Sequence, residues 1–532
     1  MKNKATELTK KEKSALLQGT DFMYTCGVPR LGIPRLAMAD GPHGLRKQIG
    51  GGDNGVSKSE PATAFPTAAC VASSWNPENA EKIGRAIGEE CRYYGVHMLL
   101  GPGVNIKRNP LCGRNFEYYS EDPLLAGKFG AAFVRGVQSM GVSACVKHFA
   151  LNNQENFRFV GNSVADERAI REIYLKPFET TVKEGKPGAV MSSYNRINGT
   201  FASENKWLLT DVLRSEWGFA GIVMSDWGGT HDRIAGICAG EDLEMPGDTA
   251  VSLKKVHDAL SDGSLSEDEA NACISRILST TEKFASVSKT GSFDRDRHSE
   301  LAAEVATDSA VLMKNDGVLP LKPGVHLALA GSHADEHGLL GGWHTDGRNE
   351  ETPSLLDAFR AEKNVTLCKP EEADVILFAC GEQQDLTGEA CSRAYPKLEE
   401  EQLQELYALS ELGKPIVMVL FCGRALVLSD ALPFCNALLN AWFPGSEGAE
   451  AIRRLLVGEE NPSGHLPVTF PRCTGQIPIH HDRIPTGRPY TTEENRYSCR
   501  YLDEKNAPLF PFGFGLSYTQ FEISDIRADT DV

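Results

Sequence analysis

The first half of the chain alternates short apolar runs with longer amphipathic stretches, and this alternation constrains the fold more than any other feature. Val142–Phe149, Gly188–Tyr194 and Gly221–Asp226 are rich in small and β-branched residues, as buried parallel strands are. Glu167–Glu184 and Asn205–Trp217, which lie between them, have helical periodicity. Strand, helix and strand at this spacing predict βαβ units, and about 285 residues of them match the size of a (β/α)₈ barrel. We therefore assign residues 1–285 to a TIM-like α/β barrel.

The apolar runs end in polar, chemically able side chains. In a barrel of this kind the active site lies at the C-terminal ends of the strands, so these side chains are expected to converge on one face. They are Asp40, Lys147, His148, Tyr194, Asn195, Ser225, Asp226 and Trp227. Because neighbours in a strand point to opposite faces, Lys147 and His148 can both face the site only if the strand bends after Val146.

A polar, glycine-containing segment at residues 286–297 (SVSKTGSFDRDR) separates the first half from a second α/β region. We interpret 286–297 as a linker, 298–515 as an α/β sandwich domain and 516–532 as a C-terminal remnant. The second domain is expected to contain helices at Ser299–Val311 and Leu398–Leu412 and buried strands at Val325–Ala330, Ala373–Cys380 and Pro415–Cys422.

The charge balance and the cysteine usage exclude several classes of protein. Lys and Arg number 55 against 72 Asp and Glu, and the net charge of −17 argues against a nucleic acid or an anionic membrane as partner. The 14 cysteines form no C-x-x-C pair and no Cys/His cluster, so neither a disulfide scaffold nor a zinc site is indicated. No signal-peptide core is visible, and no apolar run approaches the ~20 residues needed to span a bilayer. The sequence thus predicts a cytoplasmic protein with reduced thiols that acts on a neutral substrate.

Two sources of carboxylates point to chemistry. Asp226 follows a predicted strand and precedes Trp227, which can stack on a sugar ring, although a helix N-cap is the alternative interpretation. The loop 381–393 supplies Glu382, Asp385 and Glu389, although its composition also suits an acidic surface loop. Two carboxylates without metal ligands, near Arg, Lys, His and aromatic residues, indicate glycoside hydrolysis. The residues alone do not say which Glu works with Asp226.

Eight segments resemble glycoside hydrolase family 3, of the bacterial β-glucosidase type, in the order in which the family has them. They cover almost the whole chain and include KHFALNNQE, VMSDWG, GEACSR and FPFGFGLSYT. Their positions are Ala39–Gln48, Leu100–Pro123, Lys147–Glu155, Met191–Phe219, Val223–Gly228, Gly388–Arg393, Asn461–Arg472 and Phe510–Thr519.

The resemblance implies a retaining, exo-acting β-glucosidase with Asp226 as nucleophile and Glu389 as general acid/base. It implies that Asp40 binds distal sugar hydroxyls and that the same subsite is lined by Arg46, Arg114, Lys147, His148, Arg158, Tyr194 and Trp227. The family uses no metal and no organic cofactor, and its mechanism implies carboxyl groups about 5–5.5 Å apart. Because Asp226 must start ionised and Glu389 protonated, we expect a raised pKa for Glu389.

Several alternatives stay open at this point. Glu382, which lies seven residues before Glu389, is a second candidate for the acid/base. The sugar that is released could be a β-xylose or an α-arabinose, and a glycan-binding protein without activity is a further alternative. Loops 48–60 and 341–351 are expected to shape the aglycone side, and the oligomeric state is open, a homo-oligomer included.

The last residues of the chain carry one more expectation. Many members of the family follow the FGFGLSYT segment with a fibronectin type III-like β-sandwich, whereas 520–532 are enough here for only its first strand. A lone strand has no partner, so we expect it to lie against the second domain or to fray.

Overall fold

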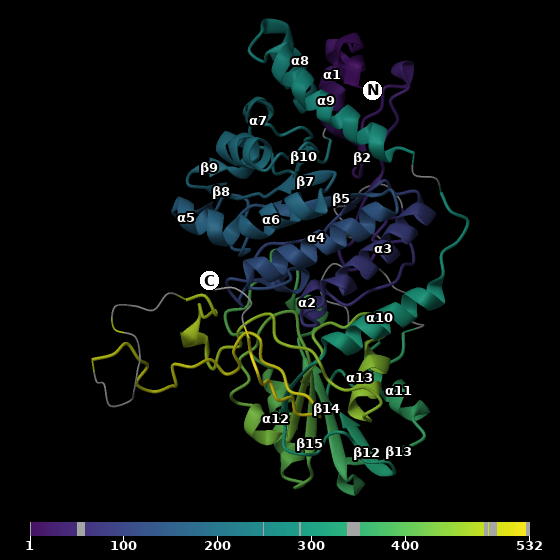
Figure 1. The fold of residues 1–532 in the computed structure, drawn as a ribbon, viewed down its shortest axis with the longest axis vertical. Helices are drawn as coiled ribbons and strands as arrows, with labels where there is room; N and C mark the ends of the chain where they lie inside the picture. The colour runs from purple at the N-terminus through teal and green to yellow at the C-terminus, as the bar shows by residue number, and fades with distance from the viewer. Residues whose placement is uncertain are drawn as a thin grey trace.

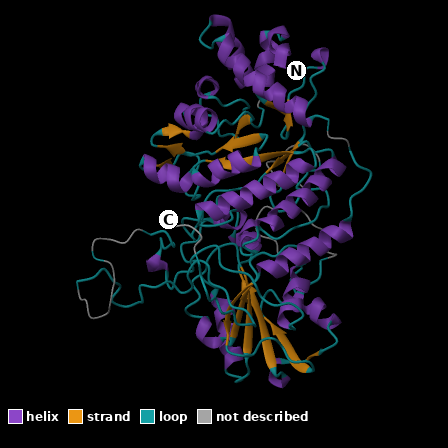
Figure 2. Cartoon of the chain, viewed as in Figure 1, coloured by secondary structure: helices purple, strands orange, loops and turns teal. Residues whose placement is uncertain are grey.

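The computed structural model describes residues 2–49, 59–247, 249–286, 289–337, 352–483, 488 and 497–527. Figure 1 shows two units stacked along the long axis of the molecule, the first coloured purple to teal and the second green. Loops gather in the region between the two sheets (Figure 2). Loops of both units can therefore contribute to one site in this region.

Five parallel strands form the sheet of the first unit, in the order β10-β7-β5-β4-β3. They are β3 Met38–Asp40, β4 Met98–Leu100, β5 Ser143–Phe149, β7 Ala189–Ser192 and β10 Ile222–Ser225. Their residues are buried apart from Asp40, which is half-buried. The long helices α3 Pro77–Tyr94 and α4 Pro123–Ser139 pack against each other on the outside of this sheet (Figure 1).

Backbone pairing continues past β10 and closes a ring. Met224 pairs with Leu243 in parallel, and Glu244 pairs with Gln18, which precedes β1 Gly19–Thr20. β1 forms a hairpin with β2 Tyr24–Thr25, and Tyr24 pairs antiparallel with Ala37 beside β3. The predicted TIM-like barrel is confirmed as the architecture, with one irregularity. The link between β1 and β2 is too short for a helical crossover, so β2 runs antiparallel to its neighbours.

The second unit is built on a six-stranded sheet in the order β11-β16-β15-β14-β12-β13. Its strands are β11 Val311–Asn315, β12 Val325–Ala330, β13 Val365–Leu367, β14 Val375–Gly381, β15 Ile416–Phe421 and β16 Ala437–Asn440. All of them pair in parallel except β11, which is antiparallel to β16. The two central strands, β14 and β15, are buried along their whole length, as their continuous apolar runs predict.

Helices cover both faces of this second sheet. Leu403 and Leu406 of α12 Glu400–Ser410 join one core cluster with one face of the sheet. α11 Leu355–Ala361 and α13 Gly448–Leu456 contribute to the cluster on the other face. Figure 2 shows the resulting layers, and the predicted α/β sandwich is confirmed.

Two local expectations differ from the structure. The helix expected over Ser299–Val311 is α10 Arg295–Ser309, and Val311 already begins β11. Apolar residues at the junction suit a buried helix end and a buried strand equally, and pairing with β16 decides between them. The segment expected as a linker, 286–297, follows α9 Glu267–Phe284, and its last three residues already belong to the first turn of α10; its role as a linker stays a prediction.

The C-terminal segment forms no strand within its described part, residues 516–527. The Leu516 amide donates to the Leu312 carbonyl at 2.9 Å, and the Tyr518 hydroxyl donates to the Leu455 carbonyl at 2.8 Å. Beyond these contacts Phe521 and Ile523 are exposed. The segment thus contacts the second unit as far as Thr519, and the apolar side chains beyond it are exposed.

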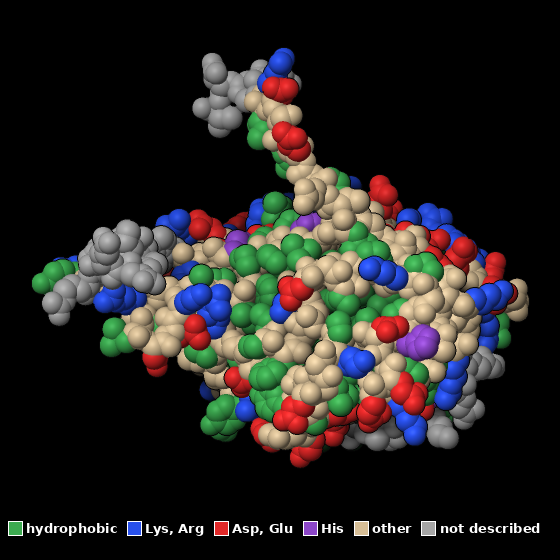
Figure 3. Space-filling view, turned by 90° about the horizontal axis from the view of Figure 1, so that it is seen from below, with side chains coloured by type: hydrophobic (Ala, Val, Ile, Leu, Met, Phe, Trp, Pro, Cys, Tyr) green, Lys and Arg blue, Asp and Glu red, His purple; other side chains and the backbone are tan. Residues whose placement is uncertain are grey.

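Two surface properties bear on the expected partners. Among the described residues, no helix is long and apolar enough to cross a membrane. Figure 3 shows basic and acidic side chains interspersed over the end of the molecule that it depicts. Among its described residues, that face thus presents no continuous basic surface of the kind that binds nucleic acid.

Candidate active site

A cavity of about 430 Å³ is lined by residues of both units. It is lined by all ten site residues that the family resemblance implied, although they come from positions spread over 350 residues of chain. They are Asp40, Arg46, Arg114, Lys147, His148, Arg158, Tyr194, Asp226, Trp227 and Glu389. Only Glu389 comes from the second unit among these ten.

The strand ends of the first unit place several of these side chains. Asp40 ends β3, Asp226 directly follows β10, and Tyr194 lies two residues after β7. Lys147 and His148 both line the cavity although they are neighbours in β5. The register of β5 against β7 shifts between Val146 and Phe149, which is the irregularity that the sequence required.

Asp226 is held through one carboxylate oxygen, and its other oxygen makes no hydrogen bond in the described structure. Its Oδ1 accepts hydrogen bonds from the Tyr194 hydroxyl at 2.9 Å and from the Trp227 amide at 2.8 Å. Its Oδ2 is buried and has no hydrogen-bond partner among the described residues. Burial, followed by the charge of Glu389, raises the pKa of Asp226 to about 6. The site thus presents one unpaired carboxylate oxygen to the cavity.

His148 is a neutral partner in this arrangement. Its Nε2 accepts a hydrogen bond from Arg114 Nη2 at 2.8 Å, because arginine can only donate. Nδ1 therefore carries the proton and donates to the Tyr118 hydroxyl at 3.2 Å. Burial and the charges of Arg114 and Lys147 hold the pKa of His148 well below its usual range. The 3.7 Å approach of its Nε2 to Asp226 Oδ2 is consequently not a charged pair.

Asp40 and Lys147 form an ion pair on the cavity wall. Lys147 Nζ lies 2.8 Å from Asp40 Oδ1. Burial would raise the pKa of Asp40, but the Lys147 ammonium outweighs it and the net shift is downward. Arg46 lies beside them, since its amide donates to the Asp40 carbonyl at 2.8 Å. Charged donors and acceptors of this kind make strong hydrogen bonds to hydroxyl groups.

Trp227 is fixed at the edge of the cavity by a residue far away in the sequence. Its Nε1 donates to the Phe22 carbonyl at 3.0 Å, and the two rings lie 6.2 Å apart. The indole face can therefore serve as a rigid wall for an apolar ligand surface.

Glu389 reaches the cavity on a loop of the second unit that is tied to the first. The Gly388 amide donates to the Gly113 carbonyl at 2.9 Å, and Cys112 pairs antiparallel with Ser392. The Glu389 carboxylate pairs with Arg158 Nη1 at 2.8 Å and with Arg114 Nη1 at 3.2 Å. Two guanidinium groups thus pair with its negative charge.

The expected direction of the Glu389 pKa shift is wrong: the structure gives a lowered pKa. Burial alone would raise the pKa of Glu389, but Arg114 and Arg158 outweigh it and the net shift is downward. Asp226 is instead the carboxyl with the raised pKa. A motif does not show which cations will surround a loop carboxylate, so the sequence could not give this direction.

Glu382 lies outside the cavity in a network of its own. Its Oε1 pairs with Arg424 Nε at 2.9 Å and with Arg393 Nη1 at 3.0 Å, and its Oε2 accepts the Gly423 amide at 3.0 Å. The Glu382 side chain is fully buried, whereas that of Glu389 is 28% exposed. The structure therefore separates the two candidates that the sequence left open.

Several residues that line the cavity were not among the expected site residues, and Arg108, of the loop that carries Arg114, lies outside the cavity. His43 is buried on the cavity wall within the ADGPHG motif, and Glu117 pairs with Arg114. Phe22 and Phe159 line the cavity from segments without any catalytic pattern. Arg108 pairs with Asp482 at 2.8 Å and does not line the cavity. The loops expected on the aglycone side lie mostly outside the described residues.

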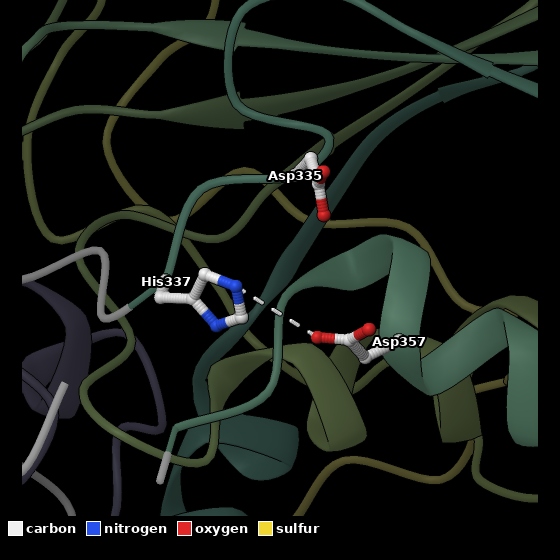
Figure 4. A group of neighbouring side chains, drawn as sticks. All are labelled: Asp335, His337 and Asp357. Carbon is white, nitrogen blue, oxygen red and sulfur yellow. Dashed lines mark ion pairs between the residues drawn. The ribbon is translucent and has the colours of Figure 1, made fainter. Parts of the chain in front are cut away.

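One side-chain group elsewhere in the described part of the chain could hold a metal ion (Figure 4). Asp335 and His337 are exposed and Asp357 is half-buried, and none of them lines the cavity. Their carboxylates already accept hydrogen bonds from Ser354, and His337 Nε2 lies 3.9 Å from Asp357. These contacts account for the group, and it has no connection to the site.

Comparisons with known proteins agree with this geometry. The "Glycosyl hydrolase family 3 N terminal domain" matches residues 28–280, and the "Glycosyl hydrolase family 3 C-terminal domain" matches residues 310–518. The thermostable beta-glucosidase B of Acetivibrio thermocellus is 39% identical, covering 98% of this chain and 73% of that protein. The exo-alpha-(1->6)-L-arabinopyranosidase of Bifidobacterium longum is 36% identical, with the same coverage of both.

A solved structure extends the likeness to three dimensions. Beta-glucosidase 3B from Thermotoga neapolitana, in complex with alpha-D-glucose, matches with a TM-score of 0.88 at 32% identity. The match covers 99% of this chain and 84% of that one. With both family domains matched in order over most of its length, the chain belongs to glycosyl hydrolase family 3 and is a glycoside hydrolase.

Proposed function

We propose that the protein is a retaining, exo-acting β-glucosidase that removes terminal β-D-glucosyl residues from small glucosides or oligosaccharides. The observation that carries the proposal is the pair Asp226 and Glu389, which different units bring to one small cavity. Relatives and a structural neighbour named beta-glucosidase support the glucose specificity.

Asp226 acts as nucleophile and Glu389 as acid/base in this proposal. The open Oδ2 of Asp226 attacks the anomeric carbon, the bond to the aglycone oxygen breaks, and that oxygen takes the proton of Glu389. Glu389 then accepts a proton from water, whose oxygen attacks the same carbon and releases Asp226. Burial raises the pKa of Asp226, whereas Arg114 and Arg158 lower that of Glu389, so the one proton that this mechanism needs must lie on Glu389 when the first step begins.

The remaining cavity residues hold the sugar. Asp40 and Lys147 bind distal hydroxyls, Arg46, Arg114, Arg158 and His148 bind others, Tyr194 orients Asp226, and Trp227 packs on the ring. An ion pair such as Asp40–Lys147 is already neutral overall, so a neutral sugar can join it without leaving a charge unpaired.

A panel of nitrophenyl glycosides tests the proposal. The β-glucoside is expected to have the highest kcat/KM, and release of β-glucose as first product, followed by NMR, would establish retention. Highest activity on the α-L-arabinopyranoside or the β-xyloside would select the second candidate, an arabinosidase or xylosidase. The name of the Bifidobacterium relative, an arabinopyranosidase, is the observation that favours the first of these. No turnover of any glycoside would indicate the glycan-binding alternative.

The pH dependence should show a falling limb above pH about 6, because Asp226 and Glu389 must together hold one proton and lose it near the raised pKa of Asp226. For an alkyl β-glucoside, kcat/KM is expected to fall about tenfold per pH unit above this point, since Glu389 cannot then donate. A dinitrophenyl β-glucoside needs no proton on its leaving group, and its kcat/KM should stay level there. Equal limbs for both substrates would contradict this assignment.

A further inference from the structure

We propose that Glu155 is a positioning residue for the acid/base, holding both the backbone beside Glu389 and the arginine that pairs with it. This inference rests on the proposed role of Glu389. Glu155 belongs to the KHFALNNQE segment of the first unit, and it does not line the cavity.

Two contacts converge on one oxygen of Glu155. Its Oε2 accepts the Ala390 amide at 2.8 Å, and that amide directly follows Glu389 in the chain. The same oxygen lies 3.0 Å from Arg158 Nη1, which itself lies 2.8 Å from the Glu389 carboxylate. Glu155 is therefore linked to Glu389 in two ways, through the backbone amide of Ala390 and through the guanidinium of Arg158.

The backbone at Ala390 needs such support. Its φ of 60° is in the left-handed region, which residues with a Cβ rarely adopt. A conformation of this kind persists only where surrounding contacts determine it. The hydrogen bond from Ala390 to a side chain of the other unit is one such contact, and it sets where the Glu389 side chain begins.

The charge of Glu155 also affects the chemistry. Arg158 now divides its attraction between two carboxylates, Glu155 and Glu389. Without the negative charge of Glu155, Arg158 would pair with Glu389 alone and would hold it more firmly in the ionised form. Proton donation to the leaving group would then suffer, whereas attack by Asp226 would not. The Oε1 atom of Glu155 has no partner in the described structure, so the Oε2 contacts are what anchor this side chain.

The test is Glu155→Gln, which keeps the shape and an acceptor for the Ala390 amide but removes the charge. We expect kcat/KM for methyl β-glucoside to fall about tenfold or more, with a much smaller fall for dinitrophenyl β-glucoside, because only the first substrate needs the acid. Glu121→Gln is the matched control. Glu121 is also a buried carboxylate of the first unit that accepts amides of the second, those of Thr469 and His481.

The outcomes separate this inference from the proposed function. Glu121→Gln should lower thermal stability and leave the ratio of the two kcat/KM values unchanged. An unchanged ratio of the two kcat/KM values in Glu155→Gln, whether or not both values fall, would overturn the positioning role. If Glu389→Ala lost activity equally on both substrates, the acid/base role of Glu389 would itself be contradicted, whatever the result for Glu155→Gln. A thermal melt of each variant shows whether folding contributes.

A second feature, on the outer side of the same cavity, points to the chemical class of the aglycone. We infer that Phe159 forms a binding surface for flat, aromatic aglycones, again on the basis of the proposed function. Phe159 lines the cavity and is 48% exposed. Its ring lies 4.8 Å from the Arg158 guanidinium, and Arg158 contacts Glu389. Because Glu389 protonates the aglycone oxygen, Phe159 lies on the leaving-group side.

The Phe159 ring is held but not covered. It meets the Tyr194 ring edge-on, with centroids 4.6 Å apart, and Arg158 lies over both rings. This packing fixes the orientation of the ring and leaves its exposed part available to a ligand. Aromatic rings stabilise each other when they stack or meet edge-on, whereas an alkyl group of one carbon offers little contact.

Benzyl and methyl β-glucosides test the inference, because their leaving groups are alcohols of similar acidity and differ in one phenyl ring. The wild type should prefer the benzyl substrate, and Phe159→Ala should reduce the ratio of kcat/KM values about 3- to 10-fold. Phe157→Ala is the matched control, since Phe157 is 81% exposed in the same segment and does not line the cavity. A wild-type ratio in Phe159→Ala, or the same loss in Phe157→Ala, would overturn the inference. If the loss of Phe159 also disturbed Tyr194, the kcat/KM values for both substrates would fall together, and their ratio would not change.

Discussion

Asp226→Asn should reduce kcat on β-glucosides by about 10⁴-fold or more, the scale of loss expected for a covalent nucleophile. The amide keeps the size of the side chain and an oxygen to accept the Trp227 amide and the Tyr194 hydroxyl. What it loses is the unpartnered Oδ2, which is the atom that forms the glycosyl-enzyme in this proposal. Initial rates with a nitrophenyl β-glucoside measure the loss.

Two further readouts make the assignment specific. A 2-fluoroglucoside with a good leaving group should label the wild type, and peptide mapping should locate the sugar on Asp226. In Asp226→Ala, azide can enter the vacated space and should yield the α-glucosyl azide, because only one displacement then takes place. Labelling at another carboxylate, or full activity of the variant, would exclude Asp226 as nucleophile.

Asp226→Asn should also stabilise the fold at neutral pH. A carboxyl whose folded-state pKa is raised, from 3.8 to about 6, favours the protonated form when folded. The contribution of Asp226 to stability should therefore fall as pH rises from about 4 to about 6, because the folded state holds the proton that the unfolded state has lost. Asp226→Asn has no such proton, so its melting temperature should exceed that of the wild type at pH 7. The advantage should vanish near pH 4, and a lower melting temperature at pH 7 would contradict it.

The sequence predicted those features that depend on local, repeating patterns, namely the buried strands and the residues at their ends. Buried runs such as Pro415–Cys422 have no other stable place than the centre of a parallel sheet, and β15 occupies Ile416–Phe421. Asp40 and Asp226 could be grouped in advance because the carboxyl ends of barrel strands must meet. The residues alone left Glu382, Asp385 and Glu389 of loop 381–393 as candidates, and the family resemblance selected Glu389 among them.

What the sequence could not supply depends on contacts between distant segments. Nothing around Phe22 signals that its carbonyl will hold the indole of Trp227, 205 residues away. The antiparallel β2 arises from ring closure, and β11 is decided by its pairing with β16. The electrostatics of Glu389 likewise depend on where Arg114 and Arg158 lie, and these cations reverse the expected direction of its pKa.

Glu389→Ala is the second substitution with a large expected effect, and its size should depend on the leaving group. For methyl β-glucoside, which needs a proton on the departing oxygen, kcat/KM should fall by about 10²- to 10⁴-fold. For dinitrophenyl β-glucoside the first step should be nearly unchanged, but the second step, which needs Glu389 as base, should slow and limit kcat. Azide needs no base, so it should restore turnover and give the β-glucosyl azide.

Glu382→Ala is the matched comparison, because it removes a buried glutamate from the same stretch of chain, seven residues away. Its carboxylate compensates Arg393 and Arg424, so its loss leaves two buried cations underpaired and should lower stability by about 3–5 kcal/mol. The folded fraction should keep the wild-type ratio between methyl and dinitrophenyl glucosides and gain nothing from azide. Azide rescue in Glu382→Ala instead of Glu389→Ala would move the acid/base role to Glu382. That outcome would require this loop to rearrange on substrate binding, since Glu382 does not line the cavity.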